Sequence, residues 1–203
     1  MKKLILLALF SCAISFAQES QLAEGPFKQL IIRGVTLING NGAPPIGPVD
    51  VVVEDDKITE VSVVGYPNVA INPKRRPQLK PGGRELDATG MYLLPGFVDM
   101  HGHIGGNAQG ADWDYVFSLW LAHGVTTVRE PSGRGLEYTL DLKRRAEKNE
   151  IIAPRIFAYT GFGQGGDEIT TPDEAREWVR QNAKNGADEI KFFGADPAIM
   201  DAA

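Results

Sequence analysis

The segment from Leu93 to His103 constrains this chain most, because a largely apolar run ends there in two closely spaced histidines. Its composition predicts a buried β-strand. Side chains along a strand alternate between faces, so His101 and His103 are expected to point the same way, with Cα atoms about 6.5 Å apart. Two imidazole nitrogens can then meet on one zinc-type ion through bonds of about 2.0–2.1 Å. The segment therefore predicts two ligands of a metal centre at a strand end.

The surroundings of the histidines favour this interpretation over an accidental pair. Gly102 lies between them and is expected to let backbone and ligand approach closely. Val98 and Met100 fall on the opposite face of the strand, where we expect helices to cover them. Strand ends are also where open α/β sheets and barrels carry their chemistry.

The first residues have the pattern of a targeting segment. Lys2 and Lys3 precede an apolar run over residues 4–14, and Ala17 offers a small-residue cleavage site. Residues 1–17 are therefore predicted to be a signal peptide, too short to span a membrane, that directs the protein to the periplasm or the medium. A lipoprotein is the less favoured alternative, because residues 9–12 only loosely match a lipid-attachment pattern.

Composition and charge argue against a nucleic-acid-binding protein and against a protein that relies on cysteine. The 203 residues, 43% hydrophobic and 23% charged, are typical of a globular protein of one or two domains. Removing Lys2 and Lys3 leaves 19 basic against 26 acidic residues, a net charge near −7, which argues against a nucleic-acid partner. The only cysteine, Cys12, lies in the predicted signal, so the mature chain has no disulfide and no thiolate ligand.

Two kinds of structure follow the signal. Short apolar runs separated by turn residues over 27–66 predict a β-meander, the main part of a small sheet or sandwich over residues 27–90. The proline-rich, basic stretch over 67–85 is interpreted as a solvated loop, with an anionic-ligand patch as the alternative.

The rest of the chain, residues 91–203, alternates between strand and helix patterns. Helices are expected over 112–123, 136–149 and from a capping box at Thr171, with the apolar stripe of the first containing Val116, Leu119, Trp120 and His123. His123 is therefore interpreted as a packed helix residue and not as a ligand. Such alternation predicts an α/β fold with a parallel sheet and right-handed crossovers.

Lys191 is a further residue of interest, within a strand predicted over 189–193. Ile190 and Phe192 share one face of that strand. If they pack under helices, Lys191 points into the interior, where an amine is costly unless it is paired or neutralised. The alternative is that Lys191 reaches solvent near the strand end, and spacing alone does not separate the two.

Two motifs together resemble the amidohydrolase superfamily of metal-dependent hydrolases, in the branch near imidazolonepropionases and Xaa-Pro dipeptidases. They are the segment 86–103, which includes the His-x-His pair, and the segment 124–129, Gly-Val-Thr-Thr-Val-Arg. The resemblance implies a (β/α)8 TIM barrel with a flanking β-sandwich and metals at the C-terminal mouth. For this chain it implies a partial barrel of about four βα units, preceded by part of the sandwich.

The resemblance also implies roles for particular residues. His101 and His103 would bind the more buried ion, and Lys191 would carry a carbamate that bridges two divalent ions, with zinc expected. A water activated by the metal would cleave amide, cyclic amide or peptide C–N bonds in a small-molecule or dipeptide-like substrate. With a single ion, Lys191 would be an ordinary lysine. Asp99 is taken as structural, and Arg129 and Glu130 as an ion pair at the rim, with substrate or ligand contacts as the alternative.

The sequence departs from the family pattern in two places. Residues 165–167 read Gly-Gly-Asp where some relatives have Gly-Gly-His, and the chain stops at Ala203, before the family's later ligands. We therefore expect an N-terminal portion of a longer enzyme, whose open barrel edge favours self-association. The alternative is a catalytically inactive fragment that binds a metal or a partner without turnover.

Overall fold

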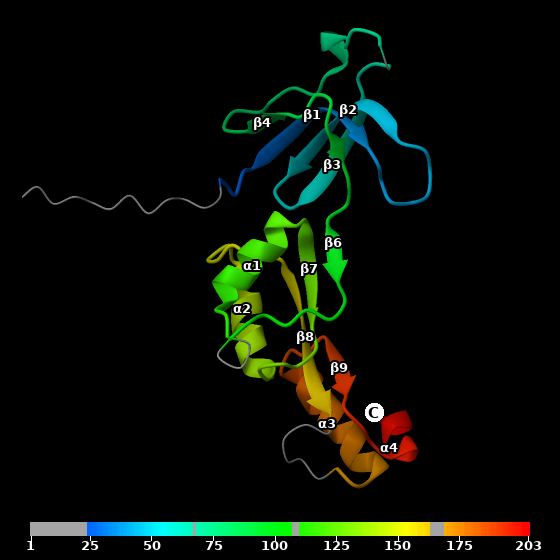
Figure 1. Ribbon diagram of the computed structural model, residues 1–203, viewed down its shortest axis with the longest axis vertical. Helices are drawn as coiled ribbons and strands as arrows, with labels where there is room; N and C mark the ends of the chain where they lie inside the picture. The colour runs from blue at the N-terminus through cyan, green and yellow to red at the C-terminus, as the bar shows by residue number, and fades with distance from the viewer. Residues whose placement is uncertain (1–23, 67, 107–109, 163–168) are drawn as a thin grey trace, which may run out of the picture.

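The computed structural model describes residues 24–66, 68–106, 110–162 and 169–203. The predicted signal peptide and residues 165–167 lie outside these ranges. The described chain forms two sheets, an N-terminal mixed sheet and a C-terminal parallel sheet with helices, joined through residues 94–96 (Figure 1). No helix in the described ranges has both the length and the apolar character needed to cross a membrane.

The N-terminal sheet has five strands in the order β3-β2-β1-β4, with β5 also paired to β1. The first three form an antiparallel meander, which confirms the predicted organisation, and β4 and β5 run parallel to β1. The strands are β1 (Gln29–Leu37), β2 (Ile46–Glu54), β3 (Lys57–Val63), β4 (Arg84–Asp87) and β5 (Tyr92–Leu93).

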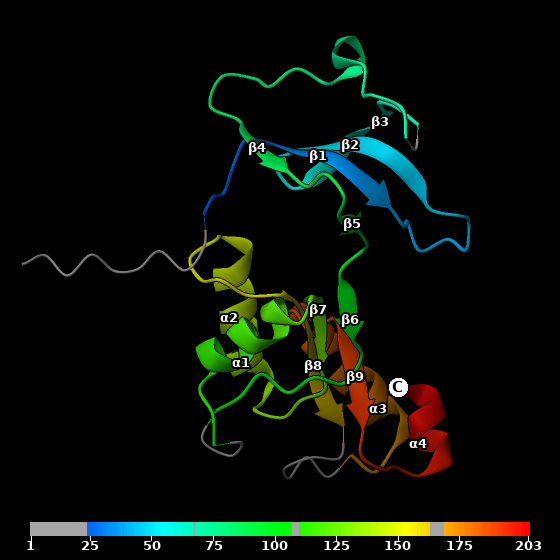
Figure 2. The same cartoon turned by 45° about the horizontal axis from the view of Figure 1, so that its top comes forward.

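One layer of the predicted sandwich is present among the described residues. The core of the sheet is a small cluster of Val35, Val49, Val51 and Ala88. Figure 2 shows this layer as a single curved sheet above the helical part of the chain. Because β5 joins it, the N-terminal sheet extends to Leu93, just beyond the boundary predicted at residue 90.

The loop over 67–85 is docked onto this sheet. It contains a short 3-10 helix, η1 (Pro73–Arg75), and the next residue, Arg76, donates from Nε and Nη2 to the two carboxylate oxygens of Asp50 at 2.9 and 3.0 Å. Lys80 pairs with Glu54 at 2.6 Å. Since these cations already have acidic partners, the structure weighs against the anionic-ligand interpretation of the loop.

The C-terminal sheet has four parallel strands in the order β6-β7-β8-β9. Helices follow the strands in alternation, as the sequence predicts. The elements are β6 (Phe97–Asp99), α1 (Trp113–Ala122), β7 (Val125–Glu130), α2 (Leu136–Glu147), β8 (Arg155–Phe162), α3 (Pro172–Lys184), β9 (Glu189–Phe192) and α4 (Pro197–Ala202).

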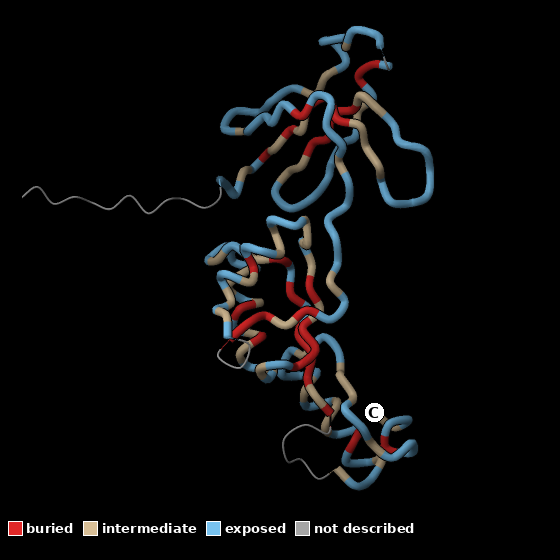
Figure 3. The backbone as a smooth tube through the Cα atoms, in the orientation of Figure 1, coloured by how far each residue is buried: buried red, intermediate tan, exposed pale blue. Residues whose placement is uncertain are grey.

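The helices pack on the sheet through two apolar clusters, and buried segments concentrate along the middle strands in Figure 3. The first contains Ile104, Phe117, Val128, Leu142 and Ile156; the second contains Phe162, Ala175 and Ile199.

The apolar stripe predicted for α1 lies on the wrong face of the helix. Its inward residue is Phe117, flanked by the rings of Trp113 and Trp120, whereas Leu119 is 43% exposed.

The prediction of a continuous buried strand over 93–103 is also wrong. Leu93 belongs to the N-terminal sheet, Pro95 has no N–H to continue a ladder, and β6 covers only three residues. Because β6 is an edge strand of the described sheet, Val98 and Met100 are 51% and 59% exposed instead of covered by helices. The two histidines therefore follow the strand instead of lying within it.

Candidate functional site

The C-terminal ends of three strands meet at one pocket of roughly 470 Å³. His101 and His103 reach it from the turn after β6, and Lys191 reaches it from β9. The pocket is also lined by residues 131–133, directly after β7, and by residues 192 and 193 at the end of β9. The structure thus brings together all three residues that the sequence singled out.

The pocket draws its lining from both edges of the sheet. Strands β6 and β9 are the two edges of the four-stranded sheet. In a flat sheet their axes would lie about 14 Å apart, at roughly 4.8 Å per strand. Residues from both edges nevertheless line the same pocket, so the side chains of His101, His103 and Lys191 extend toward one another across the sheet.

The turn after β6 presents the two imidazoles side by side. Asp99 Oδ1 accepts the backbone N–H of His101 at 2.9 Å, and Gly102 N–H donates to the Arg129 carbonyl at 3.1 Å. The rings of His101 and His103 lie 5.3 Å apart between centroids at an angle of 88°. Asp99 shapes the turn, which matches the structural role expected for it.

The spacing of the rings fits a shared metal ion. With metal–nitrogen bonds of about 2.0–2.1 Å, each ring centroid lies roughly 3.2 Å from the ion, and two such rings at a tetrahedral angle are about 5.2 Å apart. The observed separation is 5.3 Å. The distance between the two rings thus matches the one expected for neighbouring ligands of one ion.

Gly102 is needed for packing and not for ligand approach. A Cβ built at this residue would lie 2.5 Å from Val128 Cγ2 and 2.8 Å from Trp120 Cζ2. Gly102 therefore faces the helix side, where α1 and β7 leave no room for a methyl group. The expectation that it admits a ligand is wrong, although it does keep the two histidines on the opposite side.

His103 has a buried carboxylate partner, Glu130, for which the sequence offered a contact with a ligand as the alternative to a rim ion pair. Its Nδ1 lies 2.8 Å from Glu130 Oε1, and the Glu130 side chain is fully buried at the end of β7. The expected rim pair of Arg129 with Glu130 is wrong, because consecutive strand residues point to opposite faces. Arg129 instead lies over the Tyr159 ring and pairs with Glu189.

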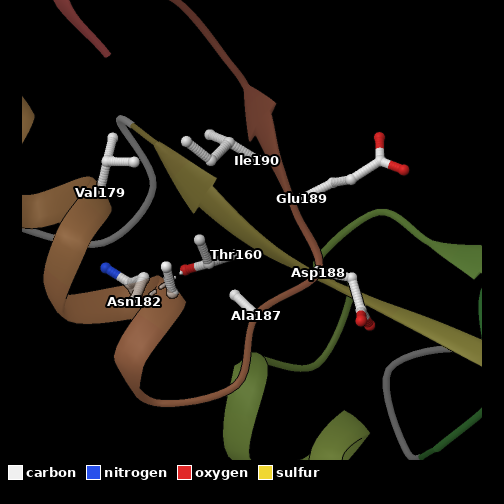
Figure 4. A pocket seen from close by; sticks show the side chains of 8 residues that line it. Thr160, Val179, Asn182, Ala187, Asp188, Glu189 and Ile190 are labelled. Atoms are coloured by element: carbon white, nitrogen blue, oxygen red, sulfur yellow. Dashed lines mark hydrogen bonds between the residues drawn. The ribbon is translucent and has the colours of Figure 1, made fainter.

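Lys191 has the orientation that would place it in the interior. Ile190 and Phe192 pack against the cluster under α3 and α4, and Figure 4 shows Ile190 on the side of α3 with Glu189 pointing away from it. Lys191 is half-buried on the pocket side, with Nζ 5.9 Å from the Phe193 ring centroid. Within the described ranges it forms no ion pair.

The third histidine lies elsewhere. His123 ends α1, is exposed, and places Nδ1 2.7 Å from the Leu119 carbonyl oxygen. It does not line the histidine pocket, and it is exposed instead of packed. The part of the chain that the structure describes contains no group of three or more His, Cys, Asp or Glu side chains arranged for a metal. The donor set at the pocket is thus two imidazoles and one amine.

A second pocket lies on the helix side, between α3 and strands β8 and β9 (Figure 4). Its polar side chains already have partners. Thr160 Oγ1 donates to Asn182 Oδ1 at 3.0 Å, and Asp188 accepts from Lys143 and from the Ala158 N–H at 2.7 Å. This pocket is a gap in helix packing, and its chemistry does not compete with that of the histidine pocket.

Comparisons with known proteins agree with this fold. No family model matches the chain. It is 35% identical over 122 residues to an adenine deaminase of Methanoculleus marisnigri and 27% identical over 175 residues to an imidazolonepropionase of Salinispora arenicola. These matches cover 56% and 82% of this chain but 23% and 41% of the relatives, so the chain spans less than half of their length.

Solved structures show the same architecture. A molinate hydrolase aligns with a TM-score of 0.63 at 22% identity, covering 87% of this chain and 50% of that one. A Xaa-Pro dipeptidase aligns with a TM-score of 0.55 at 22% identity, covering 86% and 54%. The chain therefore shares the α/β fold of these two solved structures. The chain is thus similar in sequence and in fold to proteins of the amidohydrolase superfamily.

Proposed function

We propose that this chain forms part of a metal-dependent hydrolase that cleaves amide, cyclic amide or peptide C–N bonds in small-molecule or dipeptide-like substrates. The observation that carries the proposal is the shared pocket of His101, His103 and Lys191 at the C-terminal ends of parallel strands. Relatives named adenine deaminase, imidazolonepropionase and Xaa-Pro dipeptidase support a reaction at a C–N bond.

The architecture supports this proposal. We infer that the four βα units are part of a (β/α)8 barrel and that the N-terminal sheet is part of its flanking sandwich. The parallel order of the strands, the helices on one side and the concave site on the other are the features of such a barrel. Side chains at the C-terminal ends of barrel strands then face a common mouth.

The residues at the pocket have separate parts in the proposed site. His101 and His103 would hold one divalent ion, with zinc expected from the imidazole donors. The neutral Lys191 amine would add to CO₂ and release a proton, giving a carbamate with two anionic oxygens for a second ion. A metal bound there polarises the substrate carbonyl and lowers the pKa of a bound water. The absence of an acidic partner for Lys191 in the described ranges leaves its amine available.

One observation favours the second candidate, an inactive chain that binds metal without turnover. The described pocket supplies only three donors, of which Lys191 needs modification to become an anionic ligand. In this alternative His101 and His103 still bind an ion, but no substrate is hydrolysed. A third possibility is a single-ion site, in which Lys191 keeps its ordinary charge.

Metal content separates these possibilities. We expect the chain prepared with zinc and bicarbonate to bind two ions, and Lys191→Ala to bind one, as measured by elemental analysis after gel filtration. Lys184→Ala, at the exposed end of α3, is the matched control and should retain both. Equal stoichiometry in Lys191→Ala and the wild type would rule out Lys191 as a ligand. Metal binding without hydrolysis of any dipeptide would support the inactive alternative.

Two proposals concern the whole protein. We propose that residues 1–17 direct export and that the described chain associates with further copies through its open sheet edges. Within the described residues, β6 and β9 each have a strand neighbour on one side only. The acidic net charge of −5 supports a partner other than nucleic acid.

A further inference from the structure

Glu130 is a buried ionisable residue that contacts His103 in the pocket lining, and the proposed ligand set leaves its role open. Its carboxylate is fully buried. Gly133 N–H lies 3.0 Å from both oxygens, Thr139 Oγ1 lies 3.3 Å from Oε2, and His103 Nδ1 lies 2.8 Å from Oε1. A buried carboxylate is costly unless its oxygens are all engaged, and here both oxygens have partners.

The hydrogen-bond chemistry of this contact determines which nitrogen of His103 carries its hydrogen. An ionised carboxylate only accepts hydrogen bonds, so His103 Nδ1 must be the donor. A neutral imidazole has one N–H, and its other nitrogen then has a free lone pair. With Nδ1 occupied by Glu130, that lone pair is on Nε2. A metal ion binds such a lone pair, and a carboxylate on the opposite nitrogen orients the ring and raises its basicity.

We propose that Glu130 is a positioning residue that holds His103 in the Nδ1–H tautomer and leaves Nε2 free for the pocket. The assignment of His103 as a ligand rests on the proposed function, but the tautomer is a property of the metal-free chain. The inference therefore adds a residue on β7 to a site that the sequence placed on β6 and β9.

The backbone after β7 is shaped for this contact. Ser132 has a φ of 66°, in the left-handed region, and this conformation returns the Gly133 N–H onto the Glu130 carboxylate. A Cβ at Gly133 would lie 2.5 Å from His103 Nδ1 and 3.0 Å from Glu130 Oε1. A side chain at residue 133 would therefore displace the imidazole or the carboxylate from this contact. The turn after β7 and the Glu130 carboxylate together hold the Nδ1 side of the His103 ring in place.

The first test uses the wild-type chain without metal. ¹⁵N-labelled histidine is followed by NMR at about pH 8, above the usual imidazole pKa of about 6.5, with His101→Gln and His123→Gln used to assign the signals. We expect His103 to show a protonated Nδ1 and an unprotonated Nε2. An unprotonated Nδ1 in His103 would overturn the proposal without any variant of Glu130.

The second test changes the carboxylate. In Glu130→Gln the amide no longer enforces donation from Nδ1, so we expect a mixture of His103 tautomers and a 10- to 100-fold loss of zinc affinity, the range found for partners of ligating histidines. Zinc affinity is measured by competition with a chromophoric chelator, and circular dichroism checks the fold. Glu137→Gln, an exposed change on α2, is the matched control.

The outcomes separate this inference from the proposed function. A protonated Nδ1 in a chain that binds no zinc would contradict the proposed metal centre and leave the positioning role intact. Two results would overturn the positioning role alone. One is a wild-type chain that binds zinc but has an unprotonated His103 Nδ1. The other is a Glu130→Gln variant that keeps the His103 tautomer and the zinc affinity of the wild type. If Glu130→Gln does not fold, the wild-type tautomer decides the question.

Discussion

Asp50 shows how a single residue holds the N-terminal sheet and its loop together. Its fully buried carboxylate accepts hydrogen bonds from Arg33, from Arg76 and from the Gly34 backbone N–H at 2.9–3.0 Å. Burial raises the pKa of Asp50, but the hydrogen bonds from Arg76, Arg33 and Gly34 outweigh it and hold the pKa below its ordinary 3.8. The charged form is therefore the one that the fold stabilises.

Replacing Asp50 tests this network. Asp50→Asn removes the acidic partner of Arg76 and one of the two acidic partners of Arg33, which keeps its pair with Glu85. We expect a loss of about 3 kcal/mol in the free energy of unfolding, measured by urea denaturation. Because the folded pKa is lowered, the contribution of Asp50 is present above its unfolded pKa and is lost as pH falls through the folded value. The wild type should thus lose stability below about pH 4 more steeply than Asp50→Asn. Asp56→Asn, in an exposed turn, should change neither.

The residues of the candidate site differ in how far sequence could predict them. The pair His101 and His103 and the alternation around Lys191 are local patterns, and the structure places all three at one pocket. For Glu130 the sequence offered a contact with a ligand only as the alternative to a rim ion pair, and Gly133 was missed, because their contact with His103 depends on the turn after β7 and on the neighbouring strand. A glutamate at a strand end followed by Pro-Ser-Gly was the only available signal, and it does not specify a partner.

Among the elements, α3 has the start that sequence predicts best. Thr171 Oγ1 accepts the Glu174 N–H at 3.3 Å, and Glu174 accepts the Thr171 N–H at 3.0 Å. Thr171→Ala should lower the free energy of unfolding by about 1 kcal/mol, because a helix N–H loses its acceptor. Thr171→Ser keeps the hydroxyl and should remain near the wild type. Equal stability of both variants in urea denaturation would show that the cap contributes nothing measurable.

Elements defined by long-range contacts were harder to predict than α3. The apolar run over 93–103 crosses from one sheet to the other, and nothing local shows that Pro95 and Gly96 form the junction. Helix α1 turns Phe117 inward because Trp113 and Trp120 flank it against Val128 and Ile104. Its sequence is apolar on more than one side, so periodicity alone could not choose the buried face.

At the scale of the whole molecule, the described parallel sheet ends in two strands that have one neighbour each, β6 and β9. Both strands run parallel to the rest of the sheet, so β9 of one copy can pair in parallel with β6 of another. Exposed apolar side chains at both edges, such as Phe97, Val98 and Phe193, would be removed from water by that contact.

We therefore expect the described chain to associate as its concentration rises, measured by sedimentation velocity. Val98→Lys places a charge at the β6 edge and should shift the equilibrium toward the monomer, because an edge lysine disfavours strand pairing. Tyr115→Lys adds the same charge on the exposed side of α1, where Tyr115 is 60% exposed, and should leave the equilibrium unchanged. A wild-type chain that stays monomeric across the concentration series, or an equal shift in both variants, would contradict association through the open sheet edge.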